Sequence, residues 1–276
     1  MDLLIITGIV LALMLNFVNG VNDASHSIAT VVETRALSPL KASVSSAIAN
    51  FIGPFVFTTA VAATIGTALV VPGAMTPVSL VVAMLVSIML ILAATHIGLP
   101  VSSSHALIGG ILGTGVAVAG LSALILPPAA MIRALVLFSL TGAGIGALIL
   151  SILAYYLEEG IRPALVLGVI FGISVTIPLM ILAGLLVLSG ILAIIVFIFI
   201  SPVIGFIAAF LFDLLVSHLF RFSRQNRMRR IFQPLQVAAS LFQAAGHGAN
   251  DGQHAVGVIC ALLLAGGLIP LFMVPL

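Results

Sequence analysis

Long apolar stretches follow one another through almost the whole of this sequence, and they constrain the fold more than any other feature. Charges and clusters of proline and glycine divide the chain into about eight hydrophobic segments, at 3–34, 43–71, 78–97, 102–126, 129–157, 163–187, 189–219 and 232–276. A helix needs about 20 apolar residues to cross a bilayer, so most segments are long enough. Only 6% of the 276 residues are charged, against roughly a quarter in a soluble domain. The sequence therefore predicts an all-α, polytopic protein of the cell membrane.

Several other classes of protein are excluded by the same composition. The apolar runs lack the alternation of apolar and polar residues that transmembrane strands show. The single cysteine, Cys260, excludes a disulfide within the chain and a thiolate metal cage. Met1 and Asp2 do not provide the positive flank of a signal peptide, so we expect the first segment to remain as structure.

Basic residues are concentrated between 221 and 230, which holds five of the nine. The positive-inside rule places this run on the cytoplasmic side. Counting segments back from it puts the N-terminus outside and the loop with Arg35 and Lys41 inside, in agreement with the charge of that loop. We expect the arginines to form a solvated loop beside anionic lipid; a role in ligand binding is the alternative. Nothing in the charge pattern indicates nucleic acid.

A short polar motif occurs twice. An offset of 228 residues aligns 20–26 with 248–254, and both copies read Gly-apolar-Asn-Asp-x-x-His. The two segments begin on opposite sides of the membrane by the count above, so the copies are predicted to be inverted repeats, each with a helix interrupted at the motif. The predicted divisions are a first repeat at 1–126, connecting helices at 127–220, a basic cytoplasmic loop at 221–231 and the start of a second, incomplete repeat at 232–276.

The paired motif places acidic residues deep in apolar sequence. A carboxylate inside the bilayer is costly, so Asp23 and Asp251 need a cation, a proton or a water-filled cavity nearby. Asn22 and Asn250 would supply further oxygen ligands or amide donors. Inverted repeats with interrupted helices are typical of secondary transporters that bind substrate and ions near the midplane. Alternatively, each Asp is neutral and hydrogen-bonded within the helix bundle.

A third polar cluster follows Pro100 and contains Ser102, Ser103 and Ser104. Proline ends the preceding helix, and serines are good N-caps for the next. The start of that helix would offer free N–H groups and hydroxyls, which can hold a tetrahedral oxyanion without Lys or Arg. Packing between helices is the alternative use of these serines.

A histidine follows each Asp after three residues. In a helix, this spacing places Asp23 and His26 on one face, and likewise Asp251 and His254. An imidazole beside a carboxylate could carry a proton near neutral pH or ligate a divalent cation. The alternative is that both histidines only hydrogen-bond within the bundle.

These motifs together resemble the inorganic phosphate transporters of the PiT type. The resemblance rests on Gly-x-Asn-Asp in both halves, on the stretch from Ile28 to Pro39 and on 100–105, and it covers the whole chain. It implies an all-helical inverted-repeat fold, commonly a dimer, that carries phosphate together with sodium or protons. It also implies that the Asn-Asp pairs are functional and that Ser102, Ser103 and Ser104 help to hold phosphate.

The sequence departs from the family pattern in two places. A second Pro-Val-Ser-Thr-Thr-His-like element is expected roughly 50 residues beyond Leu276, so the second repeat is expected to be incomplete. His26 and His254 stand where the first family motif usually carries Asn.

We therefore predict a secondary transporter for inorganic phosphate that works by cation-coupled symport and is no enzyme. Substrate-binding residues are Ser102, Ser103, Ser104, Asn22 and Asn250, and the coupling ion is held by Asp23, Asp251, His26 and His254. The alternatives are a sulfate permease of the same architecture, a passive channel, and an intramembrane hydrolase that uses the two Asp residues or a metal held by the Asp-x-x-His pairs. No cofactor is expected, and protons or metal–phosphate complexes are favoured over sodium for coupling. The expected partners are phosphate, the coupling cation, the lipid bilayer and a second copy of the chain.

Overall fold

The computed structural model describes residues 2–56 and 60–274 and divides the chain into two compact units. Unit 1 combines Met1–Ile125 with Arg224–Leu276, and unit 2 is Leu126–Ser223. The N-terminal and C-terminal parts of the chain therefore fold together, and the part between them forms a unit of its own. The assignment of repeats to these segments stays a prediction.

The regular secondary structure of the described residues is helical, apart from one isolated β-bridge between Val70 and Leu124. Unit 1 contains α1 (Leu3–Glu33), α2 (Pro39–Val56), α3 (Ala60–Thr67), η1 (Pro72–Ala74), α4 (Pro77–His96), α5 (Ser103–Ala119), η2 (Gly120–Ala123) and α9 (Gln225–Ala265). Unit 2 contains α6 (Ala129–Tyr156), α7 (Ile161–Leu182) and α8 (Gly190–Phe220). Among the described residues, six helices are long and apolar enough to cross a membrane, or seven if α2 and α3 form one broken span. The predicted all-α, multi-pass membrane fold is confirmed.

The predicted interruptions of the two motif helices are wrong. Helix α1 runs without a break through Asn22 and Asp23, and α9 does the same through Asn250 and Asp251. A glycine weakens a helix by only about 1 kcal/mol, and neither motif contains proline. Inside a bilayer no water replaces a broken backbone hydrogen bond, so the helical ladder continues. The break lies elsewhere, between α2 and α3, whose axes differ by 72°.

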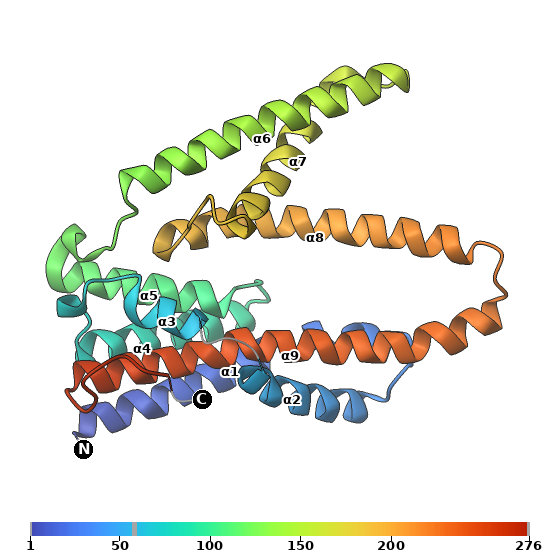
Figure 1. Ribbon diagram of the computed structural model, residues 1–276. Coiled ribbons are helices and arrows are strands. Elements are labelled where there is room, and N and C mark those ends of the chain that lie inside the picture. Colours follow the sequence, from blue (N-terminus) through green and yellow to red (C-terminus); the bar gives the residue numbers. More distant parts are fainter. Residues whose placement is uncertain (1, 57–59, 275–276) are drawn as a thin grey trace. The chain divides into compact units, whose positions relative to one another are not determined.

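Helices α1 and α9 lie side by side and antiparallel (Figure 1). The hydroxyl of Thr34, at the C-terminal end of α1, donates to Gln236 Oε1 near the start of α9. Further along, Ser240 Oγ donates to the carbonyl of Ser27. This antiparallel pairing brings the two copies of the motif to the same level of the unit.

Helix α2 packs closely against α9 through glycines. A Cβ on Gly53 would overlap the carbonyl oxygen of Ala245, and a Cβ on Gly248 would overlap the carbonyl of Asn50. Glycine at both positions therefore lets the two backbones touch, as small residues do between membrane helices. This contact places the polar face of α2 next to the second motif.

Helices α4 and α5 form a hairpin whose two outer ends lie together. Val71 donates its backbone N–H to the carbonyl of Ala123, and Ile125 donates to that of Leu69. The loop between the helices lies beside α1, where Val101 accepts a hydrogen bond from Asn22. The start of α4 and the end of α5 therefore lie together, and the loop between the two helices contacts the first motif.

Unit 2 is held together mainly by the pairing of α6 with α7. The backbones meet at Gly142 and Gly146 of α6 and at Gly168 and Gly172 of α7, where added Cβ atoms would overlap the opposite helix. Gly142 and Gly146 therefore allow close packing of α6 on α7.

Candidate functional site

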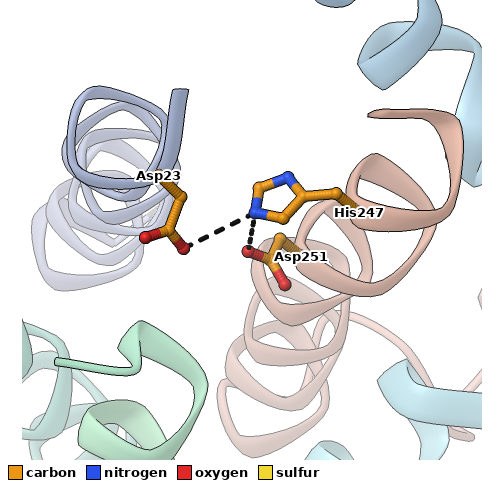
Figure 2. A group of neighbouring side chains, drawn as sticks. All are labelled: Asp23, His247 and Asp251. Carbon is orange, nitrogen blue, oxygen red and sulfur yellow. Dashed lines mark hydrogen bonds and ion pairs between the residues drawn. The ribbon is translucent and has the colours of Figure 1, made fainter. Parts of the chain in front are cut away.

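Three titratable side chains meet where the two motif copies face each other. His247 Nε2 of α9 lies 3.5 Å from Asp23 Oδ2 of α1 and 3.1 Å from Asp251 Oδ2 of its own helix (Figure 2). One ligand atom from each of the three residues lies within 4.8 Å of the others, a geometry that could hold a metal ion. Both carboxylates are largely buried. The two Asp residues singled out in the sequence are therefore brought together, as the inverted copies require.

The hydrogen bonds around His247 define its protonation. Asn50 Nδ2 donates to the carbonyl of Ser46, which leaves Asn50 Oδ1 to face His247 Nδ1 at 2.9 Å. Nδ1 must therefore carry a proton. Nε2 faces only carboxylate oxygens, which accept hydrogen bonds and cannot donate them when ionised. When both carboxylates are ionised, these surroundings fit an imidazole that carries protons on both ring nitrogens.

The contact of His247 with the Asp of the other helix has a counterpart in the first motif, where Asn19 takes the place of His247. The offset of 228 residues pairs His247 with Asn19, and Asn19 Nδ2 donates to Asp251 Oδ2 just as His247 faces Asp23. Each helix thus supplies a polar partner to the Asp of the other helix. Asn19 is only 4% exposed, and its Oδ1 has no hydrogen-bond partner in the described part of the chain. One half of the site therefore contains an imidazole, whereas the other half contains an amide whose oxygen has no hydrogen-bond partner among the described residues.

The two predicted histidines flank the cluster unequally. His26 Nδ1 lies 3.5 Å from Asp23 Oδ1, and the His26 side chain is 67% exposed. His254 Nδ1 lies 3.7 Å from Asp251 Oδ1, and its side chain is only 12% exposed. Each histidine therefore lies beside the Asp three residues before it, as the helical spacing predicts, but His26 is exposed and His254 is largely buried.

The two asparagines of the motif also differ. Asn22 Nδ2 donates to Asp23 Oδ1 at 2.7 Å, and Asn22 Oδ1 accepts from the Thr95 hydroxyl at 2.8 Å. Asn22 thereby links the first motif to the α4–α5 hairpin. Asn250 is exposed on α9 and does not line either described cavity around the Asp cluster.

The three serines take three different positions at the start of α5. Ser102 is the N-cap, and its Oγ accepts from the backbone N–H of His105, which confirms the predicted cap. Ser103 is buried and borders a small pocket, of about 10 Å³, together with Asp251 and His254. Ser104 is half-buried. Of the three, only Ser103 therefore borders a described pocket near the Asp cluster.

A larger cavity, of about 550 Å³, lies between α1, α2 and α9. Asp23, His247 and Asp251 line it, together with amide and hydroxyl side chains and an apolar part. Its polar lining is completed by Asn16, Asn19, Ser27, Ser43, Ser46 and Asn50. These described lining residues include no lysine or arginine, so His247 is the one side chain among them that can be cationic.

Sequence reasoning missed four of these residues. His247 and Asn19 escaped because the comparison of the copies stopped at the identical glycines, and the residues just before them differ. Asn50 contacts the motif only through the folding of α2 onto α9. Gln253 lies inside the second motif, and its Oε1 accepts from the backbone N–H groups of Val61 and Ala62 at 3.1 and 3.3 Å. This buried amide thus caps the start of α3 beside the bend in the α2–α3 span.

Comparisons with known proteins agree with this architecture. A model of the phosphate transporter family matches residues 19–182. The chain belongs to the phosphate transporter family. A protein of Rhizobium meliloti, named a probable low-affinity inorganic phosphate transporter, is 31% identical over 259 residues, which is 94% of this chain and 59% of that protein. A protein of the same name from Bacillus subtilis is 29% identical over 97% of this chain and 63% of its own length.

A solved structure shares the fold of this family member. The chain titled "The sodium-dependent phosphate transporter" superposes with a TM-score of 0.60 at 18% identity, over 99% of this chain and 71% of that one. These comparisons confirm the predicted family and, with the six candidate membrane spans, the membrane location. The chain spans about 60% of the length of the two curated relatives.

Proposed function

We propose that this protein is a secondary active transporter that carries inorganic phosphate by cation-coupled symport. The observation that supports it most is the meeting of Asp23, His247 and Asp251 at the contact between antiparallel motif helices, beside a cavity of about 550 Å³. Ionisable groups within a membrane bundle mark ion and substrate pathways.

The proposal assigns phosphate to the serine end of this site. Ser102, Ser103 and Ser104 offer hydroxyls at the N-terminus of α5, whose free N–H groups and helix dipole favour an anion. Asn22 and Asn250 complete the proposed substrate ligands. Phosphate placed near Asp23 and Asp251 would be repelled unless positive charge entered with it. This requirement supports coupling of the anion to a cation.

The proposal assigns the cation to Asp23, Asp251, His26 and His254. The two additional imidazoles favour protons or a metal–phosphate complex over sodium, since imidazole binds protons near neutral pH and ligates divalent metals. The solved relative is named sodium-dependent, so sodium is included as a direct competitor in the test.

The test is uptake of labelled phosphate into proteoliposomes under separately imposed sodium and proton gradients, with and without magnesium. Sulfate in excess serves as a competitor and should leave phosphate uptake unchanged. His26→Asn combined with His254→Asn should reduce uptake driven by protons or magnesium, whereas His218→Asn, an exposed histidine of α8, is the matched control. Uptake that follows sodium alone and survives the double substitution would refute the proposed coupling. Absence of phosphate uptake under every gradient would refute the transport function.

We also propose that the protein acts as a homodimer. Chemical cross-linking of the chain in native membranes should then give a species of twice the monomer mass. A monomer at every cross-linker concentration would contradict it.

A further inference from the structure

The first turns of α9 project past the end of α1. Gln233 Nε2 donates to the carbonyl of Arg35, the residue that follows the C-cap of α1, so the residues of α9 before Gln233 lie beyond that end. Pro234 lies inside α9 and removes one backbone donor, and Figure 1 shows α9 bending toward this end. We name residues 225–235 the basic arm.

The basic arm is amphipathic. Apolar side chains recur at positions i, i+3, i+4 and i+7, the spacing of one helix face. They are Met228, Ile231, Phe232 and Leu235. The remaining faces carry Asn226 and the exposed Arg227, Arg229 and Arg230. Arginines on the polar face and Phe or Leu on the other are typical of helices that lie at a membrane surface.

Two further basic residues belong to the same end of unit 1. Arg35 lies against Gln233 of α9 through its carbonyl, and Lys41 follows in the first turns of α2. Both side chains are exposed, as is the neighbouring Leu40 at 75%. The nearest acidic residue in this part of the sequence is Glu33, so positive charge dominates this end. Exposed apolar side chains thus accompany an excess of exposed cations.

We propose that the basic arm, with Arg35 and Lys41, binds the anionic phospholipid headgroups of the membrane leaflet that it faces. Arginine suits the phosphodiester because its planar guanidinium donates two parallel hydrogen bonds to phosphate oxygens. The apolar face distinguishes a lipid surface from dissolved phosphate, since free phosphate offers nothing to bury Leu235, which is 55% exposed. Basic clusters beside membrane helices bind anionic lipid through the same combination of charge and apolar contact.

The absence of tryptophan from the sequence allows a direct test of this contact. Leu235→Trp places a single fluorophore on the apolar face of the arm, and Asn226→Trp places one on the polar face as a matched control. The full chain is reconstituted in vesicles of phosphatidylcholine alone or of phosphatidylcholine with phosphatidylglycerol. We expect Trp emission at 235 to shift to shorter wavelength in the anionic vesicles and emission at 226 to stay unchanged.

Charge removal tests the role of the arginines. In the Leu235→Trp background, the shift is measured as a function of the fraction of phosphatidylglycerol. Each Arg→Gln substitution should weaken the lipid interaction about fivefold, and the triple change at 227, 229 and 230 about 100-fold. The control is Arg133→Gln, an exposed arginine of α6. High salt should also reduce the shift, because it screens exposed charges.

A further arm of the test separates lipid from dissolved phosphate. Inorganic phosphate and glycerophosphate added at the concentration of the lipid headgroups should leave the emission at 235 unchanged. The proposal is overturned if emission at 235 is the same in neutral and anionic vesicles, if the triple variant shifts like its parent, or if dissolved phosphate abolishes the shift.

Discussion

Removal of His247 should make the protein depend on added cations for its stability. The His247 imidazole lies between Asp23 and Asp251, whose nearest oxygens are within 4.8 Å of each other. At an effective dielectric constant of about 20, two negative charges at that separation repel by about 3.5 kcal/mol. His247→Gln keeps a hydrogen-bond donor of similar size but removes the positive charge. We therefore expect the variant to lose about 3 kcal/mol of stability when no cation can enter the cavity.

The assay is thermal unfolding of the purified full chain in neutral detergent at constant ionic strength. Choline chloride supplies a cation too large to fit between the carboxylates, and sodium or magnesium chloride replaces it in parallel samples. The variant should unfold at lower temperature than the parent chain in choline, and the small cations should restore most of the difference. His218→Gln serves as the control. A variant that equals the parent in choline chloride would refute the argument that His247 is a resident cation.

Three further changes test other parts of the site. Asp23→Asn or Asp251→Asn should abolish driven phosphate uptake while the protein still inserts, because removal of a buried carboxylate lowers the insertion cost; uptake in proteoliposomes and membrane fractionation measure both. Ser103→Ala should raise the half-saturation constant for phosphate severalfold, and Ser174→Ala, a buried serine of unit 2, should leave it unchanged. Gly248→Ala should force α2 away from α9 and lower thermal stability by about 2 kcal/mol; a midpoint equal to that of the parent would contradict the backbone contact.

The helices were predictable from the sequence because membrane spans need only length and apolarity. The predicted segment 129–157 differs from α6 by one residue at its end, and 78–97 differs from α4 by one at each end. The meeting of Asp23 and Asp251 was also predictable, since inverted copies of one motif face each other. These features depend on local composition and on symmetry, both of which the sequence records.

The remaining features depend on contacts between distant residues. The glycine of the second motif suggested a broken helix. Gly248 instead lets the backbone of α2 at Asn50 contact α9 directly. The bend between α2 and α3 cannot be predicted from apolarity alone. Gln253 of α9 caps the start of α3 beside this bend. His247 directly precedes the second motif, but its counterpart in the first copy is Asn19, so identity between the copies does not mark it. Its place between two carboxylates follows only from the fold.

Two contacts cross between α1 and α9 at the site, one in each direction. Asn19 of α1 holds Asp251 of α9, and His247 of α9 faces Asp23 of α1. A slide of one helix along the other by a single residue rise, about 1.5 Å, changes both contacts at once. The two contacts therefore couple the same pair of helices at two levels, so a displacement of α1 along α9 alters the surroundings of Asp23 and Asp251 together.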